Sequence, residues 1–209
     1  SNTTANSIRY NGTGDATTRV LFFLGLITST DNNQPINIAN NTIKNITNSS
    51  LYSISFVKGM VIGGTCPVTI TNNTIQELNA SAQNTNLTTE LCAVSGINIL
   101  NTGSGHVISG NIISGLRSAP GGAFATSVYG IGIDATGSGG TISKNKMSDF
   151  TNTSTDPTSN IFGTTNVNGS SWEFSNNQVS ITNSPNTNNL DIEGMHDETG
   201  TAANYYCNS

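Results

Sequence analysis

The chain has 209 residues and a formal net charge of only −5, with charged residues at 9% and hydrophobic residues at 34% of the sequence. Asn, Thr and Ser contribute 31, 30 and 25 residues, a polar but uncharged balance that is unusual for a cytoplasmic enzyme. The hydrophobic content argues against a disordered chain, and the seven scattered Lys and Arg residues argue against nucleic-acid binding.

The first predicted element is the apolar run 20–27, which is much too short to span a bilayer. No basic segment precedes it, so we interpret it as a buried strand and not as a membrane span or a signal peptide. The sequence is expected to be a mature form or an excised fragment. We expect one domain over residues 1–209.

A tandem repeat follows, with the pattern apolar-x-x-Asn-x-apolar-x-x-apolar. Its asparagines are 32, 38, 34 and 32 residues apart, and they are Asn41, Asn73, Asn111, Asn145 and Asn177. The last apolar position holds Ile46, Leu78, Leu116 and Phe150, whereas the fifth copy has Thr182 there. The repeat is clear over about residues 20–182, and residues 183–209 are expected to form a degenerate last coil or a C-terminal tail.

A second block keeps the same register. Gly96 and Gly130 each lie fifteen residues before a repeat asparagine, and Gly59 lies fourteen residues before the asparagine of its own copy. Because two independent blocks share one period, chance recurrence of a common residue does not explain the pattern.

Short runs between these positions alternate with period two and are rich in β-branched residues, as in 68–70, 97–99 and 131–133, which predicts strands. A third strand per coil is predicted within 51–57, 87–94 and 123–129. No helical periodicity is long enough for crossover helices. The sequence therefore predicts an all-β fold, a right-handed parallel β-helix of five to six coils of 32–38 residues, with three short strands per coil.

In such a solenoid, equivalent side chains of successive coils form columns at about 4.8 Å spacing. The five asparagines then stack at one bend, where a side-chain amide can donate and accept along the column. We expect this ladder to be structural.

These features resemble the right-handed parallel β-helix (pectate-lyase-like) superfamily, which includes pectate lyases and many repeat-bearing bacterial surface proteins. The resemblance covers roughly residues 20–182 and is closest in character to Asn/Thr/Ser-rich repeat proteins of the bacterial cell surface. Members of the superfamily use such ladders structurally, so the resemblance implies a fold and not an activity.

The three cysteines are too few for a disulfide framework and too far apart for a zinc site. We expect one disulfide and one remaining thiol, and the sequence leaves the pairing among Cys66, Cys92 and Cys207 open.

One acidic stretch near the end of the chain has oxygen ligands suited to calcium. Its carboxylates are Asp191, Glu193, Asp197 and Glu198. The stretch lacks a calcium-loop spacing, and the favoured interpretation is a charged edge that protects the last strand from uncontrolled pairing. No other cofactor is expected.

Catalytic constellations are missing from the repeat positions. Asp134 aligns with Leu100 and Gly63, so the coils carry no column of carboxylates for acid–base chemistry. An ice-binding threonine array is also missing, because Thr42 and Thr74 are followed in register by Ile112 and by other residue types.

The leading hypothesis is a non-catalytic structural or adhesive module of a secreted or cell-surface bacterial protein, able to assemble end to end into a fibre. Its expected partners are neighbouring modules or further copies, with surface polysaccharide as another candidate. The alternative is a carbohydrate-active β-helix, a polysaccharide lyase or glycoside hydrolase with active groups in loops 79–95 and 117–129. Ice binding is the least favoured hypothesis.

Overall fold

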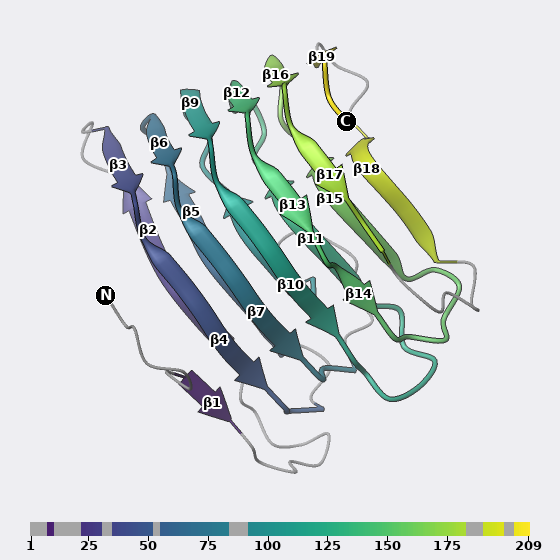
Figure 1. The fold of residues 1–209 in the computed structure, drawn as a ribbon. Helices are drawn as coiled ribbons and strands as arrows, with labels where there is room; N and C mark the ends of the chain where they lie inside the picture. Colours follow the sequence, from purple (N-terminus) through teal and green to yellow (C-terminus); the bar gives the residue numbers. More distant parts are fainter. Residues whose placement is uncertain are drawn as a thin grey trace.

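The computed structural model describes residues 8–10, 22–30, 35–51, 55–83, 92–182, 190–198 and 203–209. These residues form strands and no helix (Figure 1). The strands make three parallel sheets that wind into a β-solenoid of about five coils. The predicted fold class is therefore confirmed.

The sheets are called A, B and C. Sheet A contains β1 (Ile8–Tyr10), β4 (Thr42–Asn48), β7 (Thr74–Ala80), β10 (Ile112–Ser118), β13 (Lys146–Ser148), β14 (Thr151–Asn152) and β17 (Gln178–Ser180). Sheet B contains β2 (Phe22–Thr30), β5 (Phe56–Gly64), β8 (Val94–Ile99), β11 (Ser127–Ile133), β15 (Asn160–Asn166) and β18 (Asp191–Asp197). Sheet C contains β3 (Ile36–Ala39), β6 (Val68–Thr71), β9 (Ser104–Ser109), β12 (Gly139–Ser143), β16 (Trp172–Ser175) and β19 (Asn204–Tyr206).

The chain passes through the sheets in the order B, C, A in every coil, so β5, β6 and β7 make one complete turn. Each strand pairs with the equivalent strand of the next coil, as Figure 1 shows for the series β3, β6, β9, β12 and β16. The repeat period predicted from the asparagines is thus the length of one coil.

The position of the third strand differs from the prediction. Residues 123–126 are not in a strand, and β11 begins only at Ser127. The third strand of each coil instead follows the repeat asparagine, as β4, β7 and β10. Of the other two predicted segments, 51–57 and 87–94, residues 52–54 and 87–91 lie outside the described part of the chain.

The core consists of stacked apolar columns. One column in sheet C pairs Ile38, Ile70 and Ile108 with their counterparts Ile142 and Phe174 in later coils. All five side chains are buried. Burying each of them stabilises the fold by roughly 1.5–3 kcal/mol relative to exposure.

A glycine column marks a bend in sheet B. A Cβ atom on Gly96 would lie 2.6 Å from the Gly130 carbonyl oxygen and 2.6 Å from Ile113 Cγ2. Gly59, Gly130 and Gly163 face the same kind of obstruction. At these points the sheet B backbone lies too close to sheet A for any side chain, which explains the glycines of the sequence repeat.

Left-handed backbone conformations fix a second bend, between sheets C and A. A residue with a positive φ lies immediately before each of the five ladder asparagines and, in the last coil, before Asn208 at the equivalent position. These six residues are Asn40, Asn72, Gly110, Lys144, Asn176 and Cys207. Gly and Asn tolerate this region best. The repeated Asn-Asn and Gly-Asn pairs in the sequence therefore encode a turn.

The asparagine side chains inside this turn form a hydrogen-bonded ladder. The Asn73 Oδ1 atom accepts hydrogen bonds from the Asn41 backbone N–H (2.9 Å) and side-chain amide (3.0 Å). The Asn73 amide in turn donates to the Ile38 carbonyl at 2.9 Å. The same three bonds recur in each later coil. The column leaves no amide of an internal coil without a partner.

The expected disulfide is wrong. Cys66 and Cys92 are buried, Cys207 is exposed, and none of the three forms a disulfide. Cys66 and Cys92 occupy different places in their coils, at the approach to β6 and just before β8, so stacking does not bring them together.

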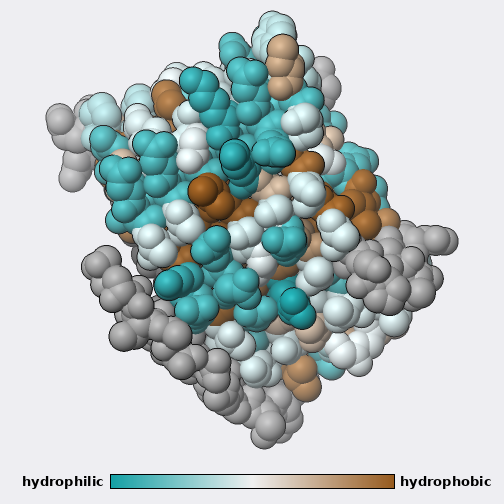
Figure 2. All heavy atoms as spheres, in the orientation of Figure 1, coloured by the Kyte–Doolittle hydropathy of each residue, from teal (hydrophilic) through white to brown (hydrophobic). Residues whose placement is uncertain are grey.

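The face toward the reader in Figure 2 is mostly hydrophilic to neutral, and its hydrophobic residues are isolated or in small groups. No helix in the described residues is long and apolar enough to cross a membrane.

Candidate functional site

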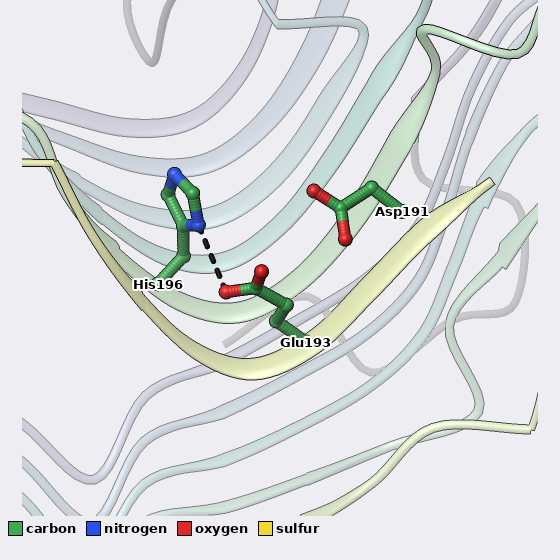
Figure 3. A group of neighbouring side chains, drawn as sticks. All are labelled: Asp191, Glu193 and His196. Atoms are coloured by element: carbon green, nitrogen blue, oxygen red, sulfur yellow. Dashed lines mark hydrogen bonds and ion pairs between the residues drawn. The ribbon is translucent and has the colours of Figure 1, made fainter.

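The last strand of sheet B brings three potential metal ligands together. Asp191, Glu193 and His196 lie on the concave outer side of β18 in Figure 3. Each offers one ligand atom, and these atoms all lie within 4.8 Å of one another.

The bend in sheet B is responsible for this grouping. In a flat strand, residues three apart point to opposite faces. At Gly194 the strand has two successive core-facing positions, because Met195 also packs against the core. Glu193 and His196 therefore both point outward, and the His196 Nδ1 atom lies 2.8 Å from Glu193 Oε2.

The imidazole of His196 is held between two carboxylates. Its Nε2 atom lies 3.2 Å from Glu198 Oε1, on the side opposite Glu193. Partial burial acts to lower the pKa of His196, but the hydrogen bonds and negative charges of Glu193 and Glu198 outweigh it, and the pKa is raised. The two carboxylates therefore stabilise the protonated imidazole more than solvent does.

Aromatic stacking fixes the plane of the same ring. His196 stacks on Phe162 with a centroid distance of 4.2 Å, and Phe162 stacks on Tyr129 at 5.6 Å. Phe162 and Tyr129 are paired neighbours in β15 and β11, so the stack follows the coil axis along the outer face of sheet B. Phe162 and Tyr129 are each 3% exposed, and the imidazole therefore rests on a buried support.

The four predicted carboxylates do not form one cluster. Asp191 and Glu193 come together with His196, and Glu198 lies on the far side of the imidazole. Asp197 turns away, where it accepts hydrogen bonds from the Asn166 amide and the Tyr205 hydroxyl. Asp197 is therefore removed from the predicted calcium ligands by the geometry, and His196 is the ligand that the acidic pattern did not assign.

The five predicted ladder asparagines all lie in the column described above, and the structure adds a sixth. Asn208 accepts from the Asn177 backbone N–H and amide at 2.9 and 3.1 Å, and donates to the Phe174 carbonyl at 3.0 Å. The signal in the sequence was a spacing of 31 residues from Asn177. It was hidden because Tyr205 takes the place of the aliphatic residue or Phe that lies three positions before each earlier ladder asparagine. Residues 190–198 and 203–209 thus continue the solenoid.

His106 is fully buried in the interior of the coil, where it makes structural contacts. Its Nδ1 atom accepts a hydrogen bond from the Val68 backbone N–H at 3.1 Å. The ring stacks with Trp172, two coils away, at 5.7 Å. Gly140 lies between them in register, and a Cβ atom there would be 2.2 Å from the His106 carbonyl oxygen.

In the part of the chain that the structure describes, the two loops proposed for a carbohydrate-active site offer few candidate catalytic groups. Residues 84–91 of the first loop lie outside the described part of the chain. The second loop, 117–129, contains no Asp or Glu. Asp134 accepts a hydrogen bond from the Asn168 amide of the next coil. Glu198 occupies the same repeat position two coils later, but Val167 lies between them, so the two carboxylates are not in adjacent coils.

Comparison with known protein families, curated proteins and solved structures finds no match to this chain. The fold defines the class of protein, a parallel β-helix built from tandem coils.

Proposed function

We propose that the chain is a non-catalytic structural or adhesive module of a secreted or cell-surface bacterial protein, which continues by coil stacking. The observation that supports this proposal is the asparagine ladder, which runs through all the described coils and reaches the last one at Asn208. The resemblance to repeat-bearing members of the right-handed β-helix superfamily supports the same role.

The last described coil of the solenoid exposes backbone and side-chain groups to which a further coil could pair. In each internal coil, the ladder asparagine donates its backbone N–H and one amide hydrogen to the asparagine of the following coil. Within the described chain, the equivalent two donors of Asn208 have no acceptor. Within the described residues, β18 and β19 likewise end their sheets with unpaired edges, whereas Ser209 already pairs with the start of β17, the last strand of sheet A. A further coil, from a neighbouring module or from a second copy, would satisfy these groups.

The composition supports an extracellular setting. Long polar columns of Asn, Ser and Thr keep a solenoid soluble with few charges, and the 9% of charged residues leaves the outer faces nearly neutral. Such faces suit contacts with neighbouring modules or with surface polysaccharide.

Two measurements in a metal-chelating buffer test the proposal. Sedimentation velocity over a wide concentration range is expected to show end-to-end oligomers, which electron microscopy would show as rods. In parallel, a chain extended after Asn208 by a copy of residues 112–145 is expected to melt at a higher temperature, because the added coil continues the ladder.

Asn208→Ala is expected to weaken self-association and to reduce the gain from the added coil, whereas Asn37→Ala, on the exposed outer face of β3, should change neither. A chain that stays monomeric at every concentration and gains no stability from the extension would overturn the proposal.

A further inference from the structure

We propose that Asp191, Glu193 and His196 form a binding site for a divalent cation of the zinc class on the outer face of β18. The three side chains supply one nitrogen and two carboxylate groups within 4.8 Å of one another. This site does not depend on association with another module or copy, since all three residues belong to one strand of a single chain.

The spacing of the ligand atoms suits a small cation. Tetrahedral coordination with bonds of about 2.0–2.2 Å places neighbouring ligand atoms about 3.3–3.6 Å apart. The His196 Nδ1 to Glu193 Oε2 distance is 2.8 Å, and the Asp191 carboxylate lies within 4.8 Å of both. Small side-chain rotations bring all three to the coordination distance, and Asp191 and Glu193 retain the exposure needed for such rotations.

The imidazole is oriented for binding through Nδ1. Glu198 accepts a hydrogen bond from Nε2 at 3.2 Å, which places the remaining proton of a neutral ring on that atom and leaves the Nδ1 lone pair facing Asp191 and Glu193. A carboxylate on the second nitrogen is the usual partner of a metal-bound histidine. The Phe162 ring, stacked at 4.2 Å, restricts rotation of the imidazole.

An independent observation comes from the neighbouring coil. Asn160 pairs in register with Asp191, and its side chain leaves the same outer face of sheet B. The residue is 9% exposed, and within the described residues its Oδ1 atom has no hydrogen-bond partner. Burial raises the pKa of Tyr129, and the side-chain hydrogen bond of Asn160 opposes this rise, as expected when the amide N–H faces the tyrosine oxygen. The Oδ1 atom is therefore a buried acceptor without a partner on the strand next to Asp191, and a cation held on this face would give it one.

The ligand set distinguishes zinc from calcium. Calcium takes six to eight oxygen ligands and does not favour imidazole nitrogen. One imidazole with two carboxylates, completed by an amide oxygen or water, fits zinc and similar first-row ions. The geometry thus points to a cation different from the calcium that the acidic pattern suggests.

Titration of the metal-free chain with zinc chloride, followed by calorimetry and by the melting temperature, tests the site. Saturable binding of one ion per chain and a raised melting temperature are expected, with calcium chloride giving neither. Binding should weaken as the pH falls through the raised pKa of His196, because the proton and the metal compete for Nδ1. X-ray absorption of the zinc-loaded chain should show nitrogen and oxygen ligands and no sulfur.

Matched variants locate the ion. His196→Gln and Asp191→Asn should remove saturable zinc binding, and Glu198→Gln should weaken it by about tenfold or more, because Glu198 positions the ring. Asp197→Asn removes a carboxylate of the same strand that lies outside the cluster, and Cys207→Ser removes an exposed thiol, so both should bind zinc normally. Circular dichroism checks that each variant folds.

Absence of saturable zinc binding would overturn the proposal. Zinc binding that survives in His196→Gln, or that disappears in Cys207→Ser, would also overturn it by placing the ion elsewhere. Calcium binding that is independent of His196 would replace it with an acidic calcium site.

Discussion

Each internal ladder asparagine is a single residue that satisfies groups in two neighbouring coils. Asn111 accepts two hydrogen bonds from Asn73 and donates to Asn145 and to the Ile70 carbonyl, and it is fully buried. Truncation at this position therefore affects several buried partners at once.

Asn111→Ala is expected to lower the free energy of unfolding by roughly 1–3 kcal/mol, because the Asn73 donors and the Ile70 carbonyl lose their partner. Urea unfolding measures the change. Asn37→Ala, at an exposed position in β3, is the control and should have almost no effect. Equal loss in both variants would show that the ladder adds no stability of its own.

The two histidines are expected to give opposite pH dependences. Burial lowers the pKa of His106, against a smaller opposing effect of the Gly103 and Asn101 carbonyls, so the unfolded chain binds the proton more readily. The stability that His106 contributes is present above pH 6.5 and is lost as the pH falls below it. His106→Phe, which retains a ring but not the titration, should flatten the unfolding free energy between about pH 8 and about pH 5.

The pKa of His196 is raised by Glu193 and Glu198, which outweigh its partial burial. Its contribution to stability is therefore present below pH 6.5 and is lost as the pH rises through the folded-state pKa. His196→Gln should remove this loss on the alkaline side. A chelator must be present in the measurement, and an unchanged pH profile would contradict the assigned pair of carboxylates.

At the scale of the elements, the bend of sheet B depends on backbone contact. Four glycines lie against the carbonyl of the next coil, namely Gly59, Gly96, Gly130 and Gly163. The bend therefore requires residues without a side chain at these positions. This bend determines which residues of each sheet B strand share the outer face.

Gly96→Ala is expected to destabilise the chain by about 1–3 kcal/mol, because the new Cβ atom would lie 2.6 Å from the Gly130 oxygen and from Ile113 Cγ2. Gly194→Ala is the matched control. Gly194 belongs to the same column but has no described coil beyond it, and its Cβ atom would meet only Val179 at 3.9 Å. Thermal unfolding of the two variants should differ clearly, and similar losses would contradict the close backbone approach.

At the scale of the whole molecule, the solenoid is a one-dimensional array in which each coil contacts its two neighbours. Residues 112–145 are one full coil, since Asn111 and Asn145 are 34 residues apart and Ile112 pairs with Lys146. Deleting this segment joins Asn111 to Lys146, which is the structural equivalent of Ile112, so the register of the later coils is kept.

Deletion of 112–145 is expected to leave a shorter β-helix that unfolds cooperatively at a lower temperature. Deletion of 112–128, which removes part of a coil, should abolish cooperative unfolding because every later strand then falls in the wrong sheet. Circular dichroism and urea unfolding compare the two chains. A folded partial deletion would contradict the fixed coil register.

Much of the architecture could be predicted because the sequence repeats with a period equal to the length of one coil. The spacing of Asn41, Asn73, Asn111, Asn145 and Asn177 gives the coil length directly, since each coil must return every side chain to the same column. The isoleucines that precede the asparagines identify the core by the same argument. A column requires the same residue type at the same place in each coil, so the repeat can be seen in a single sequence.

The parts that could not be predicted depend on contacts between sheets. The alternation of a flat strand assigns Glu193 and His196 to opposite faces, and only the packing of Gly194 and Met195 against the core brings them to one face. The separation of Asp197 from the cluster has the same cause. By itself, the sequence determined the coil and its ladder. The tertiary structure decided which side chains meet on the outer face, because the direction of a side chain after a bend depends on what lies beneath the backbone.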